Sequence, residues 1–177
     1  MSAGKKKTIA ILVEDMYQVL EVWYPVLRLK EDGIETKLVG TGNKTSYGSK
    51  EGYPAEVGCS IDQVSAKDFD GVIIPGGFAP DFLRRYEKVI MFVRQMHDDG
   101  KIVAAICHGG WLLVSADIIR GREVTCFFAI KDDLKAAGGH YVDQEVVVDK
   151  NIITSRKPED LTAFVLEIIK KVKDAKK

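Results

Sequence analysis

The stretch KIVAAICHGGWLL, from Lys101 to Leu113, carries the strongest signal for the fold. It opens with a continuous apolar run, which is typical of a strand buried on both faces of a parallel sheet. A cysteine, a histidine and two glycines follow, and a second apolar run then predicts a helix over 109–116. A strand, a sharp glycine turn and a helix in this order indicate an α/β protein.

The same alternation continues on both sides of this stretch. Further strands are predicted over 8–13, 35–40, 69–77, 123–126, 145–149 and 151–155, the last two joined by a turn near a sheet edge. Further helices are predicted from 19 to the stop at Gly33, over about 87–99, over 130–137, and from Pro158 to Val172. The segment 41–54 is rich in Gly, Ser, Asn and Lys, and predicts a turn or a small hairpin.

Strands that alternate with helices imply parallel βαβ units, with helices on both faces of one sheet. The 177 residues, 46% of them hydrophobic, suit a single domain over 1–177, and no internal repeat or linker is visible. The lysine-rich ends, about 1–7 and 173–177, are expected to be solvated, mobile tails.

Composition excludes several classes of protein. The 26 basic and 26 acidic residues cancel, so the chain has no electrostatic footprint for nucleic acid or for an acidic membrane surface. No stretch is apolar enough to span a bilayer and the N-terminus lacks an apolar signal region, so we expect a cytoplasmic protein. The three cysteines form no C-x-x-C pair and the three histidines are scattered, so we expect neither a metal nor a cofactor.

Binding sites of parallel sheets lie beyond the carboxyl ends of the strands. Three segments meet this condition: 14–21 after the first strand, the pair Gly76-Gly77, and Cys107-His108. We therefore expect them to converge on one crevice.

At its strand-to-helix turn, Cys107 faces the amide groups that begin the next helix, which favours a thiolate with a pKa well below that of free cysteine. The glycines at 109 and 110 permit a sharp turn like the nucleophile elbow of hydrolases, although Ala105 replaces the first glycine of the G-x-S-x-G form. The backbone N–H groups of Gly77 and His108 would then form an oxyanion hole. The alternative for Cys107 is an inert cysteine packed behind the sheet. The alternative for Gly76-Gly77 is an ordinary turn.

The segments EVWYPVLRLKEDG, IIPGGFAPDFLR and AAICHGGWLLVSADIIRGR resemble the PfpI family (intracellular protease I) of the ThiJ/PfpI superfamily. The resemblance runs in order from about Thr8 to Lys171. It implies a flavodoxin-like three-layer sandwich, a mostly parallel sheet with helices on both faces, and a homo-oligomer, either a dimer or a hexamer. Members are described as peptidases, deglycases, cofactor-independent glyoxalases, chaperones and redox sensors.

The resemblance also implies roles for individual residues. Cys107 matches the nucleophile, His108 the adjacent histidine, and Gly77 with the His108 amide the oxyanion hole. Glu21 matches a buried, protonated glutamate that donates a hydrogen bond to the sulfur. Asp81 falls where hexameric peptidases place a glutamate that reaches the histidine of a neighbouring subunit. Since His108 sits at a tight turn, its ring is expected to point away from its own glycine loop and to need such an acid.

Two positions depart from the family pattern. Gln18 stands where a second acid is common, and Phe127-Phe128 where relatives have Tyr-Pro or His-Pro. A phenyl ring neither transfers a proton nor forms hydrogen bonds, which argues against glyoxalase chemistry by that route unless Glu21 or His108 supplies the acid and base.

The resulting prediction is a PfpI-like hydrolase whose Cys107 attacks a carbonyl, with His108 as general acid and base. Its substrate would be a peptide, or a small dicarbonyl such as methylglyoxal and its protein adducts, and the sequence does not choose between them. The alternative is a non-enzymatic stress chaperone, or a redox sensor in which Cys107 oxidises to sulfinic acid.

Overall fold

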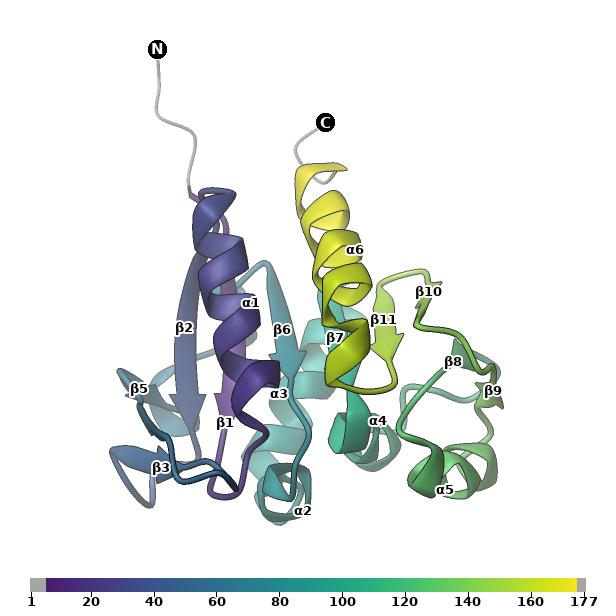
Figure 1. Ribbon diagram of the computed structural model, residues 1–177, viewed down its shortest axis with the longest axis horizontal. Coiled ribbons are helices and arrows are strands. Elements are labelled where there is room, and N and C mark those ends of the chain that lie inside the picture. The colour runs from purple at the N-terminus through teal and green to yellow at the C-terminus, as the bar shows by residue number, and fades with distance from the viewer. Residues whose placement is uncertain (1–5, 175–177) are drawn as a thin grey trace.

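The computed structural model describes residues 6–174, and a seven-stranded sheet in the order β10-β11-β7-β6-β1-β2-β5 runs through it (Figure 1). The parallel strands are β1 (Thr8–Val13), β2 (Glu35–Gly40), β5 (Cys59–Ser60), β6 (Gly71–Ile74), β7 (Ile102–Ile106) and β11 (Ile152–Ser155). The edge strand β10 (Val146–Asp149) is antiparallel to β11. The mostly parallel sheet and the pair of strands at its edge are as predicted.

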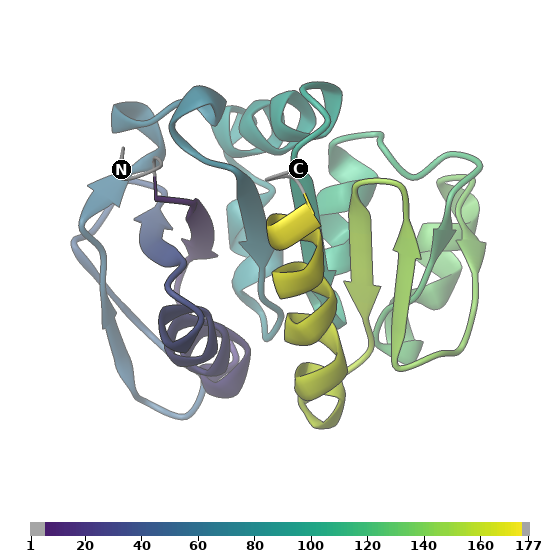
Figure 2. The same ribbon diagram turned by 90° about the horizontal axis from the view of Figure 1, so that it is seen from above.

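Helices cover both faces of the sheet, which confirms the three-layer sandwich. Helices α1 (Val19–Glu31) and α6 (Leu161–Asp174) pack together on one face, and α3 (Glu87–Asp98) covers the other (Figure 2). Three short helices lie beyond the carboxyl ends of the strands: α2 (Ala79–Leu83), α4 (Gly110–Ser115) and α5 (Lys131–Ala136). These ends are where the sequence predicts the site.

The long elements follow from their apolar patterns. Every residue of β7 is buried, because helices cover both faces of this central strand. In α6 the buried side chains form one stripe: Leu161, Phe164, Val165, Ile168, Ile169 and Val172. The predicted strand over 69–77 is shorter in the structure, since Pro75 has no N–H to donate and Gly77 has a φ of +74°.

Some of the shortest elements were not predicted. They are α2, β5 and β9 (His140–Tyr141). The strand predicted over 123–126 is present as β8 (Glu123–Val124), which pairs with β9 in a separate two-stranded sheet. Two-residue strands and a five-residue helix are too short to show a periodic pattern.

The hairpin predicted for the segment 41–54 is present. Its strands are β3 (Ser46–Gly48) and β4 (Pro54–Glu56), which pair in antiparallel orientation. The hairpin is joined to the chain that follows β1 by two backbone hydrogen bonds. Met16 N–H donates to the Gly48 carbonyl (2.7 Å), and Lys50 N–H donates to the Tyr17 carbonyl (3.0 Å). These bonds place Lys50 beside the carboxyl ends of the strands.

Of the expected tails, residues 1–5 and 175–177 lie outside the described residues. Lys7 forms an ion pair with Asp70 (2.8 Å), and Lys173 forms one with Asp32 (2.5 Å). Between residues 6 and 174, no helix has the length and apolar character that crossing a membrane requires.

Candidate active site

Cys107 follows β7 directly and has a φ of +59°, a left-handed conformation that is uncommon for a residue with a side chain. A short 3-10 turn (Cys107–Gly109) then leads into α4. The turn passes so close to β6 that a Cβ atom at Gly109 would clash with the Ile74 carbonyl oxygen. The predicted elbow geometry is therefore present, and backbone strain of this kind is concentrated at functional sites.

The three predicted segments meet around Gly76. A Cβ atom built on this glycine would lie 2.7 Å from Cys107 Cβ, 2.8 Å from Glu21 Oε2 and 2.9 Å from the His108 nitrogen. The missing side chain therefore makes room for the contact between the nucleophile turn and α1.

The backbone N–H groups of Gly77 and His108 both donate hydrogen bonds to the Cys107 sulfur. Gly77 reaches this position with its left-handed φ, and it pairs with Tyr17 in an isolated antiparallel bridge. The two amides that the sequence singles out therefore converge on one atom, where they also lie close to a carbonyl that the sulfur would attack.

Glu21 lies in the first turn of α1 and has no exposed surface. Its Oε2 accepts a hydrogen bond from Gly76 N–H (2.6 Å), and the carboxyl group also hydrogen-bonds Cys107. Oε1 is buried without a partner among the described residues. Burial raises the pKa of Glu21 to about 7, against the opposing effect of the Gly76 N–H. A substantial fraction of this carboxyl is therefore protonated at neutral pH and able to donate.

The expected low pKa of Cys107 is not found. The side chain is 7% exposed, and burial, followed by the charge of an ionised Glu21, raises the pKa of the thiol. The N–H groups of His108 and Gly77 lower it by less. The helix dipole contributes little because α4 has six residues and begins three residues after Cys107. The resting sulfur is consequently a thiol that must lose its proton during the reaction.

His108 is placed to receive that proton. Its Nδ1 lies 3.3 Å from Cys107 Sγ, so the ring lies against the nucleophile. Burial lowers the pKa of His108, and the positive charge of Lys50 lowers it further. The imidazole is therefore neutral at neutral pH and can accept a proton.

Asp81 is not part of this group within its own chain. It lies on α2, is half-exposed, and forms an ion pair with Arg85 (2.5 Å). Of the predicted residues, the structure thus brings together Cys107, His108, Glu21 and Gly77, whereas Asp81 lies apart from them.

Two neighbours of the site, Lys50 and Trp111, were not predicted to lie there, whereas Gln18 was. Lys50 comes from the hairpin, and its charge acts on both Glu21 and His108. Gln18 is the N-cap of α1, where its side chain accepts from Glu21 N–H (3.0 Å). Trp111 touches the His108 ring. The local sequence does not signal the position of Lys50, because folding brings the hairpin to the site, whereas the contacts of Gln18 and Trp111 are each made with a residue three positions away.

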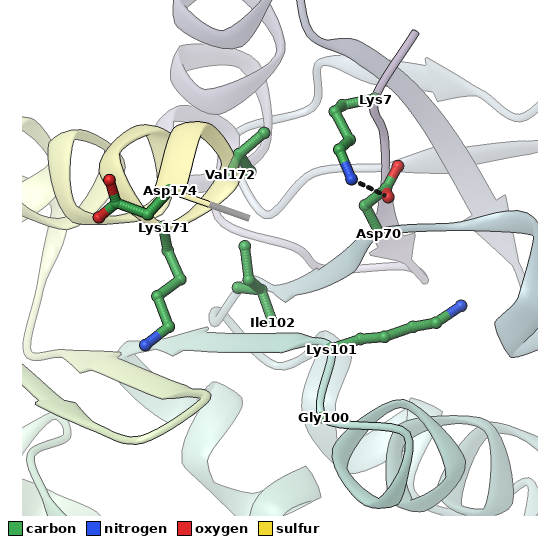
Figure 3. A pocket seen from close by; sticks show the side chains of 8 residues that line it. All are labelled: Lys7, Asp70, Gly100, Lys101, Ile102, Lys171, Val172 and Asp174. Carbon is green, nitrogen blue, oxygen red and sulfur yellow. Dashed lines mark hydrogen bonds and ion pairs between the residues drawn. The ribbon is translucent and has the colours of Figure 1, made fainter. Parts of the chain in front are cut away.

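A cavity of about 370 Å³ opens at the opposite, amino ends of the strands (Figure 3). Two of its three lysines are already engaged, since Lys7 pairs with Asp70 and Lys101 donates to the carbonyl oxygens of Ala66 and Phe69. Over residues 6–174, no three His, Cys, Asp or Glu side chains are grouped so that they could hold a metal ion.

Comparison with known proteins agrees with this geometry. The model of the DJ-1/PfpI family matches residues 7–171. The protein named deglycase TK1284 of Thermococcus kodakarensis is 41% identical over 162 residues, which cover 92% of this chain and 97% of that protein. The protein named protein/nucleic acid deglycase 2 of Escherichia coli is 41% identical over 166 residues, covering 93% and 96%.

Among solved structures, a two-domain protein from Anabaena variabilis contains a DJ-1/ThiJ/PfpI-like and a ferritin-like domain. It superimposes with a TM-score of 0.92 and is 39% identical, covering 94% of this chain. This chain spans 48%, about half, of that protein. The nucleophile turn, the sheet order and these matches agree, and the chain belongs to the DJ-1/PfpI family.

Proposed function

We propose that this protein is a cysteine-dependent deglycase, a hydrolase that removes carbonyl adducts such as those of methylglyoxal from amines. The observation that carries the proposal is the position of Cys107 Sγ. This sulfur lies 3.3 Å from His108 Nδ1 and accepts hydrogen bonds from the backbone N–H groups of Gly77 and His108. The choice of adducts over peptides is supported by the names of the relatives at 41% identity.

The proposed reaction begins with attack of the Cys107 sulfur on the carbonyl carbon. As the S–C bond forms, the thiol proton moves to His108 Nδ1 and the carbonyl electrons become an oxyanion. The amides of Gly77 and His108 stabilise this oxyanion. Where the nitrogen of the adduct is bonded to this carbon, the oxyanion collapses, the C–N bond breaks, and the imidazolium gives its proton to the departing amine, which leaves a thioester on Cys107. Water that gives a proton to His108 then attacks the thioester, the S–C bond breaks, and the proton returns to the sulfur as the acid is released. The protonated Glu21 donates to the sulfur whenever it carries negative charge.

The test is release of free amine from a peptide treated with methylglyoxal, measured for the parent protein and for two variants. Cys107→Ala should abolish turnover, whereas Cys126→Ala should retain it, because Cys126 is a buried core residue whose burial raises its pKa to about 12. Equal turnover in the parent and in Cys107→Ala would refute the proposed mechanism. Suppression of aggregation that persists in Cys107→Ala, in a parent without turnover, would favour the chaperone.

We further propose that the enzyme works in the cytoplasm as a homo-oligomer, a dimer or a hexamer. The outer face of α1 supports association, because Leu20 and Leu27, two turns apart on one side of the helix, are 53% and 60% exposed. Asp81 would then approach the His108 of a neighbouring chain.

A further inference from the structure

The imidazole of His108 lies between two aromatic rings. Phe127 is stacked on it, with ring centroids 5.0 Å apart and an interplanar angle of 29°. Trp111 meets it edge to face, at 5.2 Å and 69°. Aromatic pairs prefer these offset and T-shaped arrangements, and each one restricts the orientation of the ring that it touches.

Both aromatic walls are themselves held in place. The Phe127 N–H donates to the Cys107 carbonyl oxygen (3.3 Å), which joins this wall to the nucleophile turn. The Trp111 Nε1–H donates to Asp133 (2.8 Å), and the guanidinium of Arg84 lies 5.8 Å from the centroid of the tryptophan ring. The walls therefore have fixed positions relative to the sulfur.

Polar groups do much less to orient the imidazole. Its contact with a hydrogen-bonding side chain is the one from Nδ1 to Cys107 Sγ, and Nε2 has no partner among the residues that the structure describes. Asp81 of the same chain is paired with Arg85. One contact to a thiol leaves a ring free to turn about two side-chain bonds, so the aromatic walls supply the remaining restraint.

We propose that Phe127 and Trp111 are positioning residues that hold the His108 imidazole with Nδ1 directed at the Cys107 sulfur. The phenyl ring of Phe127 suits this task because it offers no hydroxyl that would compete for Nδ1 or for the sulfur. The proposal rests on the proposed function in one respect, namely that transfer of the thiol proton to Nδ1 contributes to turnover. The orientation of the ring can be measured without any turnover.

The first measurement is NMR of the His108 ring in the parent and in Phe127→Leu, Phe127→Tyr and Phe128→Leu. The parent should show ring-proton shifts displaced by the stacked phenyl ring and a single neutral tautomer with the proton on Nε2. Phe127→Leu should lose the displacement and mix the tautomers, and Phe127→Tyr, which keeps a stacked ring, should keep the displacement. Phe128→Leu is the matched control, because Phe128 touches Phe127 (4.7 Å), is 66% exposed and makes no ring contact with His108.

The second measurement is the rate at which iodoacetamide alkylates Cys107, followed from pH 6 to pH 9. Phe127→Leu and Trp111→Leu should each lower the rate at neutral pH by about tenfold or more, since an Nδ1 displaced by an ångström accepts the proton poorly. Trp111→Phe should restore most of the rate because it keeps an aromatic edge. In the variants the rate should depend on thiol ionisation alone and rise mainly in the alkaline range.

Unchanged His108 shifts in Phe127→Leu, together with unchanged alkylation in Phe127→Leu and Trp111→Leu, would overturn the proposal. If one leucine variant fails to fold, the other still decides, since Phe127 and Trp111 belong to different elements. A parent that lacks deglycase activity but shows these effects would refute the proposed function and leave the aromatic positioning standing. Full deglycase activity with no effect of either substitution would do the reverse.

Discussion

Glu21 links the chemistry of the site to the stability of the fold. Its pKa is about 7 when folded and near 4.5 when exposed, because burial disfavours the carboxylate. The folded state therefore binds the proton more tightly, and stability falls as the pH rises from 4.5 to 7. A difference of this size corresponds to about 3 kcal/mol of unfolding free energy. The site thus destabilises the fold in the pH range where the carboxyl ionises.

Glu21→Gln should remove this dependence, because the amide does not ionise. From pH 4 to pH 8, the unfolding free energy of the parent should fall by about 3 kcal/mol more than that of the variant, as measured by urea denaturation. Glu56→Gln, at an exposed position, is the control and should follow the parent. Parallel curves for the parent and Glu21→Gln would show that the carboxyl titrates normally in the folded protein.

Gly76 offers a second test at a single position, since its missing side chain lets Cys107, Glu21 and His108 meet. Gly76→Ala should destabilise the fold by about 1–3 kcal/mol and lower turnover at least about tenfold, because all three neighbours must move. Gly58→Ala is matched to it, as nothing lies within 4 Å of a Cβ built there. Similar melting temperatures and turnover in the two variants would contradict the close packing at Gly76.

Among the elements, predictability followed length and burial. Continuous apolar residues predict strands such as β1 and β7, and periodic apolar residues predict helices such as α6. The bounds of these elements agree closely with the prediction. The edge strand β5 and helix α2 have no such pattern, because their conformation depends on neighbours that are distant in sequence. The nucleophile turn was predictable because the residues that form it, Cys107 to Gly110, are consecutive in the sequence.

The hairpin of β3 and β4 shows what local sequence does not reveal. The sequence predicts a turn or a small hairpin over 41–54 and gives no sign that Lys50 reaches the site. There the charge of Lys50 lowers the pKa of Glu21 and of His108, in each case as a smaller effect than burial. A hairpin that supplies charge to an active site has a functional as well as a structural role.

Lys50→Gln should therefore raise the pKa of both groups. The imidazole of His108 would then be protonated at a higher pH, and the acid limb of the pH–rate profile should move toward higher pH. Titration of the His108 ring protons by NMR measures the change directly. Lys44→Gln is the control, because Lys44 lies on the same hairpin and pairs with Asp15. An identical His108 titration in both variants would exclude an effect of Lys50.

For the molecule as a whole, the order of the strands explains why the site could be anticipated. β7, β6 and β1 are adjacent in the sheet and parallel, so the loops after all three open at one edge. The pKa of the thiol could not be anticipated, since it depends on how completely the crevice covers the sulfur. That quantity depends on packing by every surrounding element.

Assembly is the remaining property of the whole molecule that bears on the site. His108 Nε2 has no partner within residues 6–174, and the half-exposed Asp81 contacts Arg85 but not its own His108. If Asp81 serves the His108 of a neighbouring chain, Cys107→Ala and Asp81→Ala should each be inactive alone and recover activity when dissociated and mixed. Random mixing into dimers makes half of them mixed, and each mixed dimer holds one complete site, so recovery should approach about a quarter of the parent activity. Native mass spectrometry would verify the mixed oligomers. Their presence without recovered activity, or a fully active monomer in sedimentation, would show that each chain completes its own site.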